Sequence, residues 1–212
     1  MSGQHGHDHP GMGHDEELGY YAQRVRAMEA VLTEKGVCSR EEIKRLVMEG
    51  DARSPSDGAR IVARAWTDPE FKKRLLADAK AAVAELGYSE SENLPDVVVV
   101  ENTDGIHHLV VCTLCSCYPT WLLGRPPDWY KSLTYRSRAV VDPRGVMGEF
   151  GLELEPGVEV RVLDSTADVR YLALPQRPEG TEGWSEEELA RLVTRDSMVG
   201  VSRALTPEPV AG

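Results

Sequence analysis

Three of the four cysteines in this chain of 212 residues lie within six consecutive positions, at Cys112, Cys115 and Cys117. A disulfide framework joins segments that are distant along the chain, and cysteines crowded into one turn do not do that. An apolar run over residues 106–111 leads directly into Cys112, so we expect the cluster on a loop at the end of a strand. The crowding therefore indicates a metal or redox site in a reducing compartment.

The balance of charge limits the class of partner. The chain has 24 Lys and Arg against 35 Asp and Glu, which gives a formal net charge of -11. Phosphate binding needs clustered basic side chains, so this balance argues against nucleic acid. No apolar run reaches the roughly 18 residues that would span a membrane, and the polar start of the chain lacks the apolar region of a secretory signal. We therefore expect a soluble cytoplasmic protein that binds neither nucleic acid nor membrane.

The first 90 residues divide into a polar tail and a helical arm. Residues 1–16 are poor in apolar side chains and contain four of the six histidines, His5, His7, His9 and His14. We expect residues 1–16 to form a disordered tail with only loose affinity for divalent metal. Residues 17–90 have the apolar spacing and capping signals of a helical N-terminal arm. Its first two helices are short for the apolar surface they carry, which favours packing on a partner chain.

Local signals in this arm predict three helices. The first follows an apolar stripe through residues 21–32 and ends before Gly36. The second opens on a capping box formed by Ser39 and Glu42. The third covers residues 68–87, with a proline in its first turn and a glycine at its end.

After residue 91 the pattern changes to strands. Runs of strand-forming residues cover 97–100, 106–111, 158–162 and 169–174. A capping box of Ser185 and Glu188 then opens a helix that reaches about Arg195. We expect residues 91–212 to form the metal-binding catalytic domain. The predicted fold class is α+β, a helical N-terminal arm followed by a mixed-sheet layered α/β domain that bears the metal loop.

The spacing within the cysteine turn predicts an unusual ligand set. Cys112 and Cys115 have the C-x-x-C spacing of a shared metal site, and Cys117 follows only two residues later. Two sulfurs, from Cys115 and Cys117, and the amide nitrogens of Ser116 and Cys117 could form a nearly planar chelate. The Cys112 sulfur would cap one face, so that five positions are filled and the sixth is open. A deprotonated amide ligand favours a strongly Lewis-acidic trivalent ion, cobalt(III) or iron(III).

Other interpretations of the cysteine turn stay open on spacing alone. A structural zinc site would need His107 or His108 as its fourth ligand. An iron–sulfur cluster would need Cys38, the only other cysteine, and the C-x-x-C pair could instead serve redox chemistry. The two histidines are adjacent on the expected strand, so we expect one to face the core and the other the surface.

A resemblance to a known family rests on the hexapeptide Cys112-Thr113-Leu114-Cys115-Ser116-Cys117. This run is similar to the metal-binding claw of the nitrile hydratase α-subunit family. The likeness extends from about residue 20 to residue 201. It continues through further segments at residues 126–132, 135–138, 143–144, 164–165, 170–171, 178–181 and 193–196.

The resemblance implies a non-corrin metal centre in an assembly with a β-subunit, as a heterodimer or heterotetramer. Cobalt members of the family carry Thr after the first cysteine and iron members carry Ser, so Thr113 points to cobalt(III) rather than iron(III). By the same resemblance, Cys115 would be oxidised to sulfinic acid and Cys117 to sulfenic acid, while Cys112 stays a thiolate. Arginines of the β-subunit would bind the added oxygens, and a metal-loading activator protein is a further implied partner.

The implied activity is the hydration of a small nitrile to an amide, with the metal as a Lewis acid. The expected metal ligands are Cys112, Cys115, Ser116 and Cys117. The expected catalytic residues are Cys117, Cys115 and Ser116. The sulfenate oxygen of Cys117 would act as nucleophile or as base, and both roles stay open at this stage.

Two other functions remain alternatives. The metal-bearing subunit of thiocyanate hydrolase shares the claw, and a metal-storage or assembly protein would bind metal without turnover. Where the family commonly reads Tyr-Pro-Trp-Pro after the claw, this chain has Tyr118-Pro119-Thr120-Trp121, which leaves the substrate open. Three arginines either support the anionic claw or pair with carboxylates: Arg136, Arg138 and Arg170. The position of Arg170 on an expected strand favours a buried ion pair.

Overall fold

The computed structural model describes residues 14–88 and 95–207. It divides the chain into two compact units, residues 1–49 and 50–212. Most of the predicted His-rich tail, residues 1–13, lies outside the described residues. Among the helices that are described, none is both long enough and apolar enough to cross a membrane.

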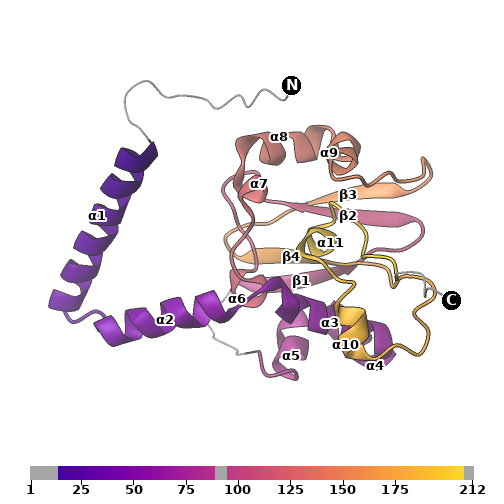
Figure 1. The fold of residues 1–212 in the computed structure, drawn as a ribbon, viewed down its shortest axis with the longest axis horizontal. Helices are drawn as coiled ribbons and strands as arrows, with labels where there is room; N and C mark the ends of the chain where they lie inside the picture. The colour runs from indigo at the N-terminus through magenta and orange to yellow at the C-terminus, as the bar shows by residue number, and fades with distance from the viewer. Residues whose placement is uncertain (1–13, 89–94, 208–212) are drawn as a thin grey trace. The chain divides into compact units, whose positions relative to one another are not determined.

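Two helices account for the N-terminal unit, α1 (His14–Glu34) and most of α2 (Arg40–Ala52) (Figure 1). After α1 the chain passes through Gly36 with a φ of 66°, a left-handed conformation that glycine adopts without strain. The predicted capping box at the start of α2 is present. Ser39 N donates to the Glu42 carboxylate (2.7 Å), and Glu42 N donates to Ser39 Oγ (3.1 Å).

The apolar side chains of these two helices are exposed. No residue of α2 is buried among the residues described there. The exposed set includes Tyr21, Val25, Met28, Leu32, Leu46, Val47 and Met48. Because helices in proteins are stabilised mainly by packing an apolar face, this pair needs a covering surface.

The second unit opens with α3 (Pro55–Thr67), α4 (Pro69–Ala77) and α5 (Ala79–Ala84). The sequence analysis did not anticipate α3, and it expected one helix where α4 and α5 stand. The break falls at Asp78, whose carboxylate accepts a hydrogen bond from Ala81 N (3.0 Å) and caps α5.

The second unit includes helices that the sequence analysis assigned to the N-terminal arm. The helical arm was expected to reach residue 90, but α4 and α5 pack against strand β1 (Asp96–Glu101) of the second unit. Burial of Phe71 and Leu75 in α4 and of Val83 in α5 holds these helices to the core. Apolar periodicity alone does not say which surface a helix packs on.

In the described part of the chain, four strands form two parallel pairs rather than the mixed sheet expected. β1 pairs with β4 (Val169–Leu174), and β2 (Ile106–Val111) pairs with β3 (Glu159–Asp164) (Figure 1). Parallel neighbours need a long connection, which the helices between β2 and β3 provide. The predicted α+β class, with helices and small sheets, is confirmed.

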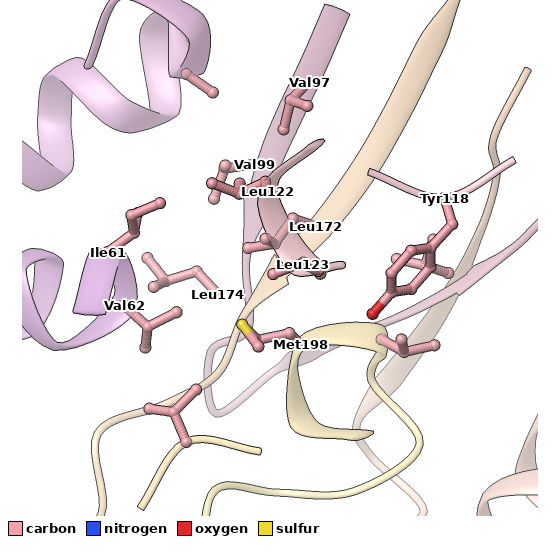
Figure 2. Packing of buried hydrophobic residues seen from close by; sticks show 14 of the residues in the cluster. Ile61, Val62, Val97, Val99, Tyr118, Leu122, Leu123, Leu172, Leu174 and Met198 are labelled. Carbon is pink, nitrogen blue, oxygen red and sulfur yellow. The ribbon is translucent and has the colours of Figure 1, made fainter. Parts of the chain in front are cut away.

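Short helices fill the connections of the second unit. Their bounds are α6 (Thr120–Leu123), α7 (Asp128–Lys131), α8 (Leu133–Val141), α9 (Pro143–Glu149), α10 (Glu186–Ala190) and α11 (Arg195–Val199). Side chains from α3, α6, α11 and the β1–β4 pair meet in one buried cluster. Figure 2 shows its members Ile61, Val62, Val97, Val99, Leu122, Leu123, Leu172, Leu174 and Met198.

Two adjacent histidines of β2 are buried, and one of them joins the strand to the end of α11. His107 is 4% exposed and His108 is 7% exposed, so the expectation that one faces the surface is wrong. Asn102 makes the burial of both possible, because its Oδ1 accepts from His108 N (2.8 Å) while its Nδ2 lies 3.3 Å from His107 Nδ1. His107 Nε2 donates to the Gly200 carbonyl (2.8 Å). Burial lowers the pKa of both imidazoles.

Replacing Gly200 by alanine should destabilise the chain. Gly200 has a φ of 90°, and an added Cβ would overlap the carbonyl oxygen of His108. A non-glycine residue in such a conformation costs on the order of 1–3 kcal/mol before the overlap is relieved. We expect Gly200→Ala to lower the free energy of unfolding, measured by urea titration, by at least about 2 kcal/mol. Gly148→Ala, with open space around its Cβ, should change it by less than about 1 kcal/mol, and equal effects would contradict the prediction.

Candidate metal centre

The three clustered cysteines stand on the loop that follows β2. Cys112 comes directly after the strand and is 0% exposed, whereas Cys115 is exposed and Cys117 is half-buried. Their Sγ atoms all lie within 4.8 Å of one another. The separations are 3.4 Å between Cys112 and Cys115 and 3.1 Å between Cys115 and Cys117. The fold thus gathers the three sulfurs at one point, and we call residues 112–117 the claw.

The sulfur–sulfur distances favour one coordination geometry. With a metal–sulfur bond of about 2.3 Å, two sulfurs at a tetrahedral angle are about 3.8 Å apart, and two at a right angle are about 3.3 Å apart. The observed 3.4 and 3.1 Å match the right-angled arrangement. The donor set therefore fits a six-coordinate ion better than tetrahedral zinc.

A fourth side-chain ligand is missing from the described part of the second unit. No histidine or carboxylate there joins the three sulfurs within ligand distance. His107 and His108, the residues that a zinc site would need, are held instead by Asn102 and Gly200. Further ligands from this loop would have to be backbone atoms or hydroxyl groups, and the amide nitrogens of Ser116 and Cys117 stay the predicted ones.

Asp164 holds the start of the claw. It is the last residue of β3 and stands opposite Val111 in the parallel register. Its Oδ1 accepts from Thr113 N (2.9 Å), and its Oδ2 accepts from Thr113 Oγ1 (2.5 Å). A single carboxylate thereby binds both donors of the residue that follows the first cysteine.

Aromatic residues from α7 and α8 hold the backbone on either side of the claw. The buried Tyr130 donates its hydroxyl to Cys117 O (2.9 Å), and Tyr135 donates to Val110 O (2.6 Å). The Tyr130 ring packs edge-on against Tyr118, with ring centroids 5.2 Å apart. These contacts fix the position of the last claw residue and of the strand that enters the claw.

Arg136 of α8 also binds the claw. Its Nε donates to Cys112 O (3.1 Å), and its Nη2 donates to Thr113 O (2.8 Å). The sequence analysis left open whether this arginine supports the claw or pairs with carboxylates. The structure shows the first arrangement.

The other two arginines considered near the claw behave differently. Arg138 forms an ion pair with Glu149 (2.5 Å) on the far side of the α8–α9 turn. Arg170 has two buried nitrogens, Nε and Nη1, with no hydrogen-bond partner among residues 14–88 and 95–207. The buried ion pair expected for Arg170 is therefore not formed there.

The cysteine thiols influence each other electrostatically. Hydrogen bonds from the thiols of Cys117 and Cys112 lower the pKa of Cys115 to about 7. Burial, with the Cys115 thiolate alongside, raises the pKa of Cys117 to about 12. The thiol of Cys115 is therefore more acidic than that of Cys117. Cys115 is also the exposed cysteine of the claw.

Sequence reasoning missed three residues that hold the claw. Asp164 and Tyr135 stood in segments that resemble the family, but no pattern indicated that they contact the claw. Their roles depend on a parallel strand register and on the angle at which α8 meets β2. Tyr130 was expected only to pack in a rigid loop, and its hydrogen bond to Cys117 follows from the position of α7.

Comparisons with known proteins agree on one family. The family model described as nitrile hydratase, alpha chain matches residues 19–202. The low-molecular weight cobalt-containing nitrile hydratase subunit alpha of Rhodococcus rhodochrous is 55% identical over 188 residues, 88% of this chain and 90% of that protein. Thiocyanate hydrolase subunit gamma of Thiobacillus thioparus is 39% identical over 204 residues, 92% of this chain and 83% of that protein. A solved structure, a double mutant of Fe-type nitrile hydratase from Comamonas testosteroni Ni1, superposes with a TM-score of 0.81 at 42% identity, covering 92% of this chain and 97% of that one.

Alkylation of the metal-free chain should separate the thiols by pH. The thiolate is the reactive form, so the rate at which Cys115 reacts with iodoacetamide should rise through pH 6, reach half its maximum near pH 7 and level off about one pH unit higher. Cys117, with a pKa raised to about 12, should lag at every pH in this range. Peptide mass spectrometry would follow each site, and Cys115→Ser should remove the component that reacts near neutral pH. Equal rates at Cys115 and Cys117 would contradict the assignment.

Proposed function

The chain belongs to the nitrile hydratase α-chain family, and from that premise we propose that it is the metal-bearing α-subunit of a cobalt nitrile hydratase. The reaction adds water to a nitrile carbon and gives the amide. The observation that carries the proposal is the claw, in which Cys115 Sγ lies 3.4 Å from Cys112 Sγ and 3.1 Å from Cys117 Sγ, the spacing of neighbouring positions around a six-coordinate ion. Cobalt is favoured by Thr113 and by a relative that is named as cobalt-containing and shares 55% of its residues.

In this proposal the claw supplies every protein ligand of the metal. The sulfurs of Cys112, Cys115 and Cys117 and the amide nitrogens of Ser116 and Cys117 would hold cobalt(III). When bound, cobalt supplies Lewis acidity that polarises the nitrile or its attacking water. Asp164 keeps Thr113, the second claw residue, in place, and Tyr130 keeps Cys117, the last one, in place.

Oxidation of two cysteines completes the proposed centre. With dioxygen as the proposed oxidant, Cys115 would become a sulfinic acid with two added oxygens and Cys117 a sulfenic acid with one, while the buried Cys112 would stay a thiolate. The sulfenate oxygen of Cys117 would then accept a proton from the attacking water, or attack the nitrile carbon itself. If water attacks, the amide product takes the oxygen and both hydrogens of that water. If the sulfenate attacks, its own oxygen passes to the amide. A water molecule then adds to the Cys117 sulfur as the S–O bond breaks, which restores the sulfenate and gives both water hydrogens to the amide.

The proposed partner is a β-subunit that covers the claw. Residues 113–116 are exposed, and the side chain of Leu114 is 87% exposed at the tip of the loop. Basic side chains of the partner would neutralise the oxygens added to Cys115 and Cys117. A metal-loading activator protein and a cytoplasmic setting belong to the same proposal, and the four free thiols are typical of a reducing compartment.

A subunit of thiocyanate hydrolase is the second candidate. The chain aligns with thiocyanate hydrolase subunit gamma over 204 residues, although at lower identity than with the nitrile hydratase subunit. A change of aromatic position at Thr120 and Trp121, close to the claw, favours testing both substrates. Turnover of thiocyanate without turnover of nitriles would select this candidate.

Co-expression with the β-subunit and cobalt should give a loaded, oxidised and active complex. We expect about one cobalt per α chain by elemental analysis, and three added oxygens on the peptide that contains residues 112–117 by mass spectrometry. The complex should hydrate small nitriles such as acetonitrile. Cys117→Ala should lose cobalt and turnover together, because the claw then lacks one sulfur ligand. A Cys117→Ala complex with full cobalt and full turnover would refute the mechanism, and metal binding without any turnover in the wild type would favour a storage role.

The exposed face of α1 should be needed to bind the β-subunit. Met28→Asp combined with Leu32→Asp places charges on the apolar stripe, and each buried apolar side chain contributes about 1.5–3 kcal/mol. We therefore expect at least about a tenfold rise in the dissociation constant of the α–β complex, measured by analytical ultracentrifugation. Gln23→Asp adds a charge to an exposed polar position of the same helix and should leave the dissociation constant unchanged. Similar values for both variants would mean that the partner binds elsewhere.

A further inference from the structure

The first turn of α8 (Leu133–Val141) lies against the end of β2 and the start of the claw. Ser132 caps the helix, with its Oγ accepting from Tyr135 N (3.1 Å). Two side chains of this first turn then bind three carbonyls of the backbone segment that leads into the claw. Tyr135 binds Val110 O, and Arg136 binds Cys112 O and Thr113 O.

The peptide plane between Cys112 and Thr113 is held at both ends. Its carbonyl accepts from Arg136 Nε (3.1 Å), and its N–H donates to Asp164 Oδ1 (2.9 Å). The following carbonyl, Thr113 O, accepts from Arg136 Nη2 (2.8 Å). The orientation of these two planes sets the direction in which the chain leaves Cys112, because only φ and ψ are free to rotate.

We propose that Arg136 is a positioning residue for the claw, which fixes the two peptide planes after Cys112 and so brings Cys115 and Ser116 to their ligand positions. This inference rests on the proposed function, in which those two residues bind cobalt. The turn is tight, because the backbone N–H of Cys115 donates to Cys112 Sγ (3.3 Å).

The contact requires the shape of arginine. A guanidinium is a rigid fork, so Nε and Nη2 can bind two neighbouring carbonyls at a fixed separation. A lysine ammonium brings the same charge as a single point and cannot hold both carbonyls in one geometry. The positive charge also suits a centre whose sulfur ligands and two deprotonated amides are anionic.

The experiment compares three variants in the cobalt-loaded α–β complex. Arg136→Gln removes the fork and the charge, and Arg136→Lys keeps only the charge. Arg138→Gln is the matched control, because Arg138 is on the same helix and its partner is Glu149. For each complex, the measurements are cobalt content, added oxygens on the claw peptide, the sulfur-to-cobalt charge-transfer absorption, kcat and KM. Hydrogen exchange at residues 113–117 of the metal-free chain provides a readout that needs neither cobalt nor turnover.

We expect Arg136→Gln to lower kcat at least about tenfold with KM within about twofold, because a displaced reacting group can cost up to a hundredfold. Its charge-transfer band should shift and its claw amides should exchange faster. Arg136→Lys should fall between this variant and the wild type, and Arg138→Gln should match the wild type in every measurement.

Wild-type values for kcat, absorption and exchange in Arg136→Gln would overturn the inference. If Arg136→Gln fails to assemble, Arg136→Lys decides, and a wild-type band and exchange rate in that variant would overturn it as well. If the wild-type complex takes up no cobalt or hydrates no nitrile, the proposed function fails separately. In that case faster exchange in Arg136→Gln than in Arg138→Gln still supports the role of Arg136, and equal exchange rejects it.

Discussion

Val111 at the end of β2 stands opposite Asp164 at the end of β3, and the claw depends on this parallel register. Ser165, one residue further on, donates its backbone N–H to Val111 O (2.7 Å) and continues the pairing to the last residue before the claw. A shift of one residue would move the side chain of Asp164 to the opposite face of the sheet. Thr113 would then lose the partner of both its N–H and its hydroxyl. The geometry of the claw is thus an extension of strand pairing into a loop.

Polar contacts at both ends of β2 maintain that register. At its start, His107 binds Gly200 O and the amide of Asn102 binds both neighbouring histidines. At its end, Tyr135 binds Val110 O. The last three strand residues, 109–111, are fully buried and give the pairing its apolar support. Because the polar groups at each end form hydrogen bonds, their burial costs little free energy. These hydrogen bonds can form in only one position of the strand, so they specify its register.

Local sequence signals predicted the elements but not their pairings. The strand that enters the claw, the capping boxes at Ser39 and Ser185, and the crowding of three thiols all follow from patterns within a few residues. Parallel pairing of β2 with β3 joins segments about 50 residues apart, and no local pattern carries that information. The burial of both histidines was missed for the same reason, since it requires Asn102 and the end of α11 to be in place. For the claw, the sulfur ligands could be named from spacing, whereas the side chains that hold them came from distant elements.

The three thiols differ steeply in their access to solvent, from the enclosed Cys112 to the exposed Cys115. An oxidant that diffuses in from water meets Cys115 first, the half-buried Cys117 next and Cys112 last. The different depths of the three thiols below the surface can therefore add to the difference in pKa between Cys115 and Cys117 and make oxidation selective without a dedicated recognition site. The loop would in this way encode an order of reaction as well as a set of ligands. Burying the claw under a second subunit would then close that route once the centre has matured.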